Sequence, residues 1–159
     1  MELAERINDP GILMEALCLR GVTSYYRGEF AGTRADCARA VADYDDRSRT
    51  QFWAGTFGED SGIVNRCFLA LALWHLGYPD QALKANGEML LLARAIGQPC
   101  DLCLALIHKS LLYRFCRLAA EDAAEEAIRI ATEFMQLHKD LMPGWEGVCE
   151  LRAFASGGP

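Results

Sequence analysis

The sequence lacks an excess of positive charge and any long apolar run, and each absence excludes a class of protein. Its 159 residues carry 16 Lys and Arg against 22 Asp and Glu, so the net charge is −6. A dedicated nucleic-acid-binding protein would show a basic face. The longest apolar stretch, residues 67–76, contains His75 and is far shorter than the roughly 20 residues of a membrane span. We therefore predict no nucleic-acid partner and no membrane segment.

Features of secretion are also scarce. The first ten residues, MELAERINDP, are charged and short of apolar side chains, unlike a secretory signal. The seven cysteines are odd in number and irregularly spaced, which fits free and mostly buried thiols in a reducing compartment. We therefore expect a cytoplasmic protein, and the apolar content of 52% is typical of a globular chain with a substantial core.

Strand patterns are missing as well, because β-branched residues rarely alternate with polar ones. The sequence therefore predicts an all-α fold. Proline and glycine punctuate it into predicted helices at about residues 10–27, 30–44, 61–76, 79–97, 99–117, 120–137 and 143–155. The third of these is apolar on almost every side, so we expect it to be a central buried helix.

An internal repeat connects distant parts of the chain. Residues 2–17 match residues 91–106, which lie 89 positions further on, and the same alignment places Gly21 on Ser110. Placing Gly28 on Gly77 gives a third copy, in which Ala70 takes the same small-residue position. Each copy has a first helix with a small residue midway and an alanine-rich second helix, and a glycine closes the first helix at Gly28 and Gly77.

Such helix hairpins bury their apolar faces by stacking on one another. The repeat predicts a right-handed α-solenoid of about three hairpins, forming a single helical-repeat domain over residues 1–159. Its expected units are residues 10–45, 61–97 and 99–138, with partial units at 1–8 and 143–155. These partial units lead us to expect a piece of a longer array.

Four stretches, YYRGEF, FGEDSG, LALWHLGYPDQAL and ARAIGQP, resemble the tetratricopeptide-like region of large bacterial signalling ATPases. That group includes ATPase-linked adenylyl cyclases and LuxR-type transcriptional regulators. The resemblance covers most of residues 2–137 and implies a sensor or interaction arm whose ATPase and output parts lie elsewhere. The long connection at 45–62, together with Arg20 and Arg66 near usually apolar positions, departs from the ordinary 34-residue repeat.

The residues that bear chemistry do not form a recognisable catalytic set. Cys100 and Cys103 form a C-x-x-C motif at a predicted helix start, a position that lowers the thiol pKa in redox proteins. No second cysteine pair or histidine pair completes a zinc site, so helix packing is the favoured interpretation. His75, within an apolar helix, is interpreted as a core or groove histidine making one hydrogen bond. We predict no enzyme, no cofactor and no metal.

Aromatic and polar residues outside the regular core are candidate partner anchors. Three aromatic residues in the long connection either anchor a partner or fold over the core: Phe52, Trp53 and Phe57. Helical arrays usually bind along the concave side, which first helices line. The candidates on those helices are Glu15, Tyr25, Tyr26, Arg66 and His75.

The expected function is that of a non-enzymatic protein–protein interaction or sensor module of a larger bacterial signalling or regulatory protein. Its partner would be a protein, a peptide or the output domains of the parent chain. One alternative is a small-molecule or peptide ligand-binding domain, which a closed pocket lined by Trp53, Trp74 or Trp145 would favour. Another is a homo-oligomerisation arm, which an exposed apolar patch would favour.

Overall fold

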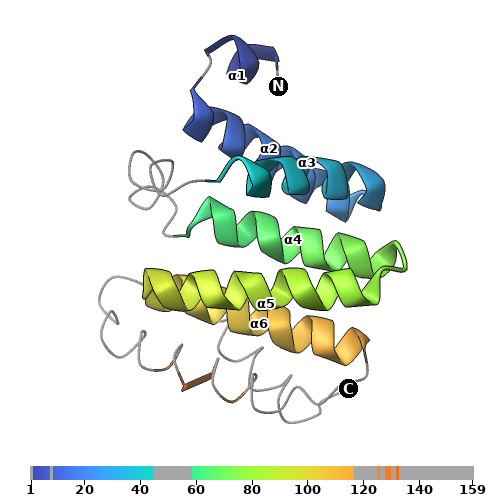
Figure 1. The fold of residues 1–159 in the computed structure, drawn as a ribbon, viewed down its shortest axis with the longest axis vertical. Helices are drawn as coiled ribbons and strands as arrows, with labels where there is room; N and C mark the ends of the chain where they lie inside the picture. The colour runs from blue at the N-terminus through green and yellow to red at the C-terminus, as the bar shows by residue number, and fades with distance from the viewer. Residues whose placement is uncertain are drawn as a thin grey trace. The chain divides into compact units, whose positions relative to one another are not determined.

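The computed structural model describes residues 2–7, 9–44 and 59–116, together with residues 125, 128, 129 and 132. Within these ranges it contains six helices and no strand, so the predicted all-α fold is confirmed. The helices are α1 (Glu2–Ile7), α2 (Pro10–Tyr26), α3 (Phe30–Ala42), α4 (Ser61–His75), α5 (Pro79–Ile96) and α6 (Pro99–Phe115), as Figure 1 shows. The predicted helices at 120–137 and 143–155 lie outside the described residues, apart from the four single positions.

The chain divides into two compact units, with the boundary inside α5 after Met89. The first unit contains α1 to α4 and the beginning of α5, and the second contains the end of α5 and α6. Each helix of the first unit up to α4 packs on the one before it, and α2 also packs on α4.

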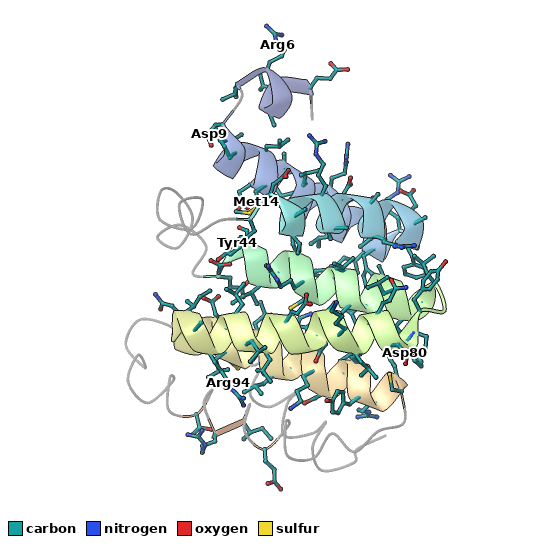
Figure 2. The ribbon with its side chains drawn as sticks, viewed as in Figure 1. Arg6, Asp9, Met14, Tyr44, Asp80 and Arg94 are labelled. Atoms are coloured by element: carbon teal, nitrogen blue, oxygen red, sulfur yellow. The ribbon has the colours of Figure 1, made fainter. Side chains whose placement is uncertain are left out.

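Local side-chain chemistry explains where the first helices begin. Asp9 lies directly before α2 (Figure 2). It caps the helix by accepting a hydrogen bond of 3.0 Å from the Ile12 amide, and Pro10 occupies the first turn. Asp60 caps α4 by accepting bonds of 2.8 Å from Gly62 and 3.2 Å from Ile63. The predicted helix starts at residues 10 and 61 are therefore confirmed.

Two equivalent turns close α2 and α4. Gly28 and Gly77 adopt φ angles of +79° and +84°. Residues other than glycine rarely adopt such positive values. The amide of Glu29 donates to Ser24 O and the amide of Tyr78 donates to Leu73 O, both at 2.9 Å. These paired residues are all 49 positions apart, so the turn geometry repeats at the predicted spacing.

The core of the first unit forms where α2, α3 and α4 meet. Met14, Leu17 and Ala40 are buried together, with Tyr44 packed against them. Helix α4 has the largest buried set of the three, which confirms its predicted central position: Ile63, Cys67, Phe68, Leu71 and Leu73 are among its buried residues. The three small residues aligned by the repeat, Gly21, Ala70 and Ser110, are also buried.

Helix α3 ends at Ala42, two residues earlier than predicted. The Asp43 amide still bonds to Arg39 O at 3.1 Å, but Tyr44 has left the helix. Its hydroxyl donates to Asp60 Oδ2 at 3.0 Å, so the tyrosine links the end of α3 to the start of α4. This contact between distant residues shortens the helix and is invisible to a local pattern.

Candidate interaction site

A polar network surrounds the start of α4. Glu15 of α2 accepts a hydrogen bond from the Ser61 hydroxyl, and Asp60 lies beside it. Burial, together with the nearby Asp60 carboxylate, raises the pKa of Glu15 to about 7. Glu15 therefore takes up a proton near neutral pH and is engaged within the fold.

Arg66 belongs to the same end of α4. Its Nη1 donates to the Gly62 carbonyl at 2.9 Å, and its guanidinium lies 5.0 Å from the centroid of the Tyr44 ring. Burial lowers the pKa of Arg66. Gly62 accommodates the tyrosine, because a Cβ there would overlap the Tyr44 ring. The arrangement gives Arg66 contacts inside the unit.

An aromatic cluster occupies the opposite end of α4. The His75 ring stacks on Phe30 with centroids 4.3 Å apart and planes 9° apart, and His75 Nε2 lies 3.2 Å from the Tyr25 hydroxyl. Tyr25 also packs edge-on against Phe68 at 5.3 Å, and burial raises its pKa. Tyr26 flanks this cluster and is 77% exposed.

The described candidate residues thus form two groups instead of one row. Glu15 and Arg66 lie near the start of α4, whereas Tyr25, Tyr26 and His75 lie near its end. A 15-residue helix separates its ends by about 20 Å. Phe52, Trp53 and Phe57 lie outside the described residues.

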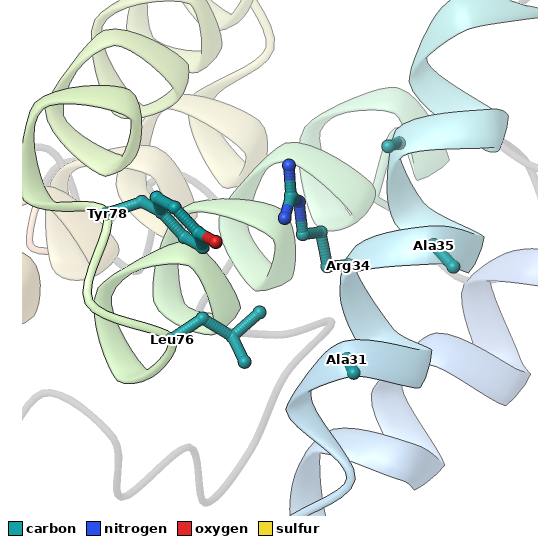
Figure 3. Close-up of a pocket in the computed structure, with 6 residues that line it drawn as sticks. Ala31, Arg34, Ala35, Leu76 and Tyr78 are labelled. Atoms are coloured by element: carbon teal, nitrogen blue, oxygen red, sulfur yellow. The ribbon is translucent and has the colours of Figure 1, made fainter.

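An open groove adjoins the aromatic cluster, between α3 and the turn that joins α4 to α5 (Figure 3). Its volume is about 500 Å³. The lining residues are Ala31, Arg34, Ala35, Ala38, Leu76 and Tyr78. Five of them are exposed and Leu76 is half-buried, so the groove is a surface feature and not a closed cavity.

Arg34 and Tyr78 face each other across this groove (Figure 3). The Arg34 guanidinium carbon lies 4.9 Å from the centroid of the Tyr78 ring, a cation–π contact. Sequence reasoning did not single out either residue. A signal was present in the spacing of Ala31, Ala35 and Ala38 on one helical face, but alanines at such spacing are ordinarily assigned to a core.

The alanine face of α3 points outward because polar residues on the opposite face bind α2. Asp36 receives two hydrogen bonds from the Arg20 guanidinium, at 2.6 Å from Nε and 2.5 Å from Nη2. Thr33, which is fully buried, donates to the Gly21 carbonyl at 3.0 Å. Arg20, an unexpected residue for an apolar helix position, is thereby explained as the partner of Asp36.

Cys103 and His108 of the second unit are shielded from solvent. Burial raises the pKa of Cys103 to about 11, opposite to the lowering that a redox C-x-x-C motif uses. His108 Nδ1 lies 3.0 Å from the Leu104 carbonyl, and burial lowers the pKa of this histidine. Across the described parts of the chain, no three His, Cys, Asp or Glu residues are placed to hold a metal ion.

Comparisons with protein-family models, curated proteins and solved structures give no match for this chain. The resemblance to tetratricopeptide-like regions therefore stays a prediction from the sequence. Among the helices described, none combines the length and apolar character needed to cross a bilayer.

Proposed function

We propose that this protein is an interaction module that binds a segment of another protein in the groove between α3 and the α4–α5 turn. The observation that carries the proposal is the open, largely exposed groove of about 500 Å³ beside the aromatic cluster. Aromatic side chains at such positions commonly anchor partners, since they supply large contact areas at low entropic cost.

The helical scaffold suits this role. We infer that α2 and α3 form one hairpin of a tetratricopeptide-like solenoid and that α4 begins the next, which the repeated turns at Gly28 and Gly77 support. The resemblance to bacterial signalling ATPases further suggests a sensor or interaction arm of a larger regulatory protein. In that setting the groove would recruit a partner or an output domain.

The groove favours a peptide over an enclosed small molecule. Binding sites for small molecules usually bury most of their ligand. Here the lining residues are mostly exposed, and Trp74 is not among those that line the groove within the described part of the chain. Trp53 and Trp145 lie outside the described residues. An extended chain segment can lie in such a groove and continue beyond both of its ends.

Self-association is a second candidate, and it rests on the outer face of α2. Leu19 and Tyr26 are 67% and 77% exposed and lie seven residues apart, hence on one face of the helix. Light scattering over a concentration series tests it: Leu19→Glu would convert a dimer to a monomer, and a wild-type monomer at all concentrations would exclude this candidate.

The peptide proposal is tested by selecting binders from a random peptide library displayed on phage. Ala35 is exposed and lines the groove, so Ala35→Trp fills the groove without entering the core. Ala42→Trp is the matched control, because Ala42 is exposed on the same helix and does not line the groove. Helix content by circular dichroism and the melting temperature establish that both variants fold.

We expect peptides selected on the wild-type chain to bind Ala42→Trp equally well and Ala35→Trp at least about tenfold more weakly, since a filled groove removes its apolar contacts. Failure to enrich any peptide, or equal binding to both tryptophan variants, would refute the proposal.

A further inference from the structure

We propose that the groove selects acidic segments, with a partner Asp or Glu carboxylate bound by Arg34 and a small apolar side chain resting on the three alanines. This inference rests on the proposed function and adds the chemistry of the partner. It follows from the state of the Arg34 guanidinium, the shape of the groove floor and the charges nearby.

Arg34 differs from Arg20, Arg27 and Arg66 in its polar contacts. Arg20 pairs with Asp36, Arg27 pairs with Glu29 at 2.9 Å, and Arg66 donates to a backbone carbonyl. Within the described residues, the side chain of Arg34 makes its cation–π contact with Tyr78 and no hydrogen bond or ion pair. Its N–H donors therefore remain available to a ligand.

The Tyr78 ring orients the Arg34 guanidinium for that ligand. A guanidinium whose face rests on an aromatic ring keeps its N–H edges directed away from the ring. Those edges match the two oxygens of a carboxylate in a bidentate pair. Tyr78 thus acts as a positioning residue that reduces the conformational freedom Arg34 would lose on binding.

The floor of the groove limits the size of the neighbouring partner side chain. Ala31, Ala35 and Ala38 lie at positions i, i+4 and i+7 of α3 and present only methyl groups. Leu76 adds an apolar wall (Figure 3). A side chain such as Ala, Val or Leu would bury apolar surface there while its acidic neighbour reaches Arg34.

The charges around the groove oppose the binding of acidic peptides. The chain carries a net charge of −6, which disfavours acidic peptides at long range. Glu29 is already paired with Arg27, and Asp80 lies in the first turn of α5 just beyond Tyr78. A preference for acidic peptides would therefore have to arise from local contact with Arg34.

The experiment compares synthetic peptides on the whole 159-residue chain by fluorescence polarisation. The probes are the strongest library-selected peptide, the same peptide with each Asp and Glu replaced by its amide, and a version with Lys at those positions. The variants are Arg34→Gln, Arg34→Lys and Tyr78→Leu, with Arg39→Gln as the control, since Arg39 is exposed on α3 outside the groove.

We expect the selected peptides to be enriched in Asp and Glu, and the amide version to bind about tenfold or more weakly, as for loss of a charge-assisted hydrogen bond. Arg34→Gln should weaken the acidic peptide to the same degree and leave the amide peptide unchanged. Arg34→Lys should restore part of the affinity, because it keeps the charge and loses the bidentate geometry. Arg39→Gln should bind as the wild type does.

The outcomes separate the two proposals. Peptides that bind equally well as acid and amide, yet are lost on Ala35→Trp, would overturn acidic selectivity and leave the groove function standing. No binding by any peptide would overturn both. If light scattering showed that Ala35→Trp abolishes a dimer, the occupant would be a second copy of this chain and the acidic-peptide inference would fail.

Discussion

At the scale of single residues, Gly21 has no room for even a methyl group. A Cβ at this position would lie 2.7 Å from Cys37 Sγ, and Cys37 is fully buried between helices. We expect Gly21→Ala to lower the free energy of unfolding by about 1–3 kcal/mol through overpacking. Urea denaturation followed by circular dichroism measures this change.

Two further variants test the cause. Gly87 lies inside α5, is exposed and has no atom within 4 Å of an added Cβ, so Gly87→Ala should raise stability by about 0.5–1 kcal/mol. Adding Cys37→Ala to Gly21→Ala should recover part of the loss by removing the sulfur. If the loss in the double variant equalled the sum of the losses in Gly21→Ala and Cys37→Ala, the steric account would be wrong.

Glu15 makes stability depend on pH. Its pKa rises from 4.5 to about 7 on folding, so the folded state binds the extra proton between these values. The free energy of unfolding therefore falls as pH increases through this range and levels off above it. Glu15→Gln keeps an oxygen for the Ser61 hydroxyl and removes the titration.

The comparison is made by urea denaturation at pH values from about 5 to about 8, where Glu15 changes from protonated to charged. Wild type and Glu15→Gln should be similar in stability at the acidic end, and the variant should gain a growing advantage toward the alkaline end. A constant difference across the range would show that Glu15 titrates as an ordinary exposed carboxylate.

At the scale of helices, Asp60 is expected to contribute more than the other aspartate cap. It accepts from two backbone amides of α4 and from the Tyr44 hydroxyl, whereas Asp9 accepts from one amide of α2. Asp60→Ala should cost about 1–2 kcal/mol and Asp9→Ala about 0.5–1 kcal/mol. The loss at Asp60 should be largest near pH 5, where neutral Glu15 is not repelled by this carboxylate.

Thermal and urea unfolding of the two alanine variants provide the measurement. Equal losses would mean that the Tyr44 link and the second backbone bond add nothing to the cap at Asp60.

The helices themselves could be predicted because their signals are local. Pro10 and Pro79 open helices, and Gly28 and Gly77 close them, all at the predicted places. The early end of α3 could not be predicted, since it depends on a bond from Tyr44 to Asp60, 16 positions away. Local patterns carry no information about such partners.

The candidate site was only partly predictable for the same reason. Tyr25, Tyr26 and His75 come together as neighbours of one cluster, but the groove residues Arg34 and Tyr78 were missed. Assigning the exposed face of α3 requires knowing that Arg20 meets Asp36 and that Thr33 meets Gly21, and these are contacts between helices. Because the polar face of α3 is the buried one, its alanine face is exposed, which is the opposite of the usual assignment.

At the scale of the molecule, the groove results from the way α3 packs on α4 within the first unit. Helix α3 supplies its alanines and Arg34, and the turn after α4 supplies Leu76 and Tyr78. Phe30 of α3 and His75, the last residue of α4, stack on each other next to Ala31 and Leu76 in the sequence. Any change in the packing of α3 on α4 would therefore alter the groove, and with it the peptide binding that we propose.

The most direct test of this account is nuclear magnetic resonance of the isotope-labelled chain during titration with the strongest library-selected peptide. We predict that the largest amide shift changes fall on the groove residues, led by Ala31, Arg34, Ala35 and Tyr78. Changes centred instead on Glu15, Ser61 and Arg66 would place the binding site at the other end of α4 and contradict the account.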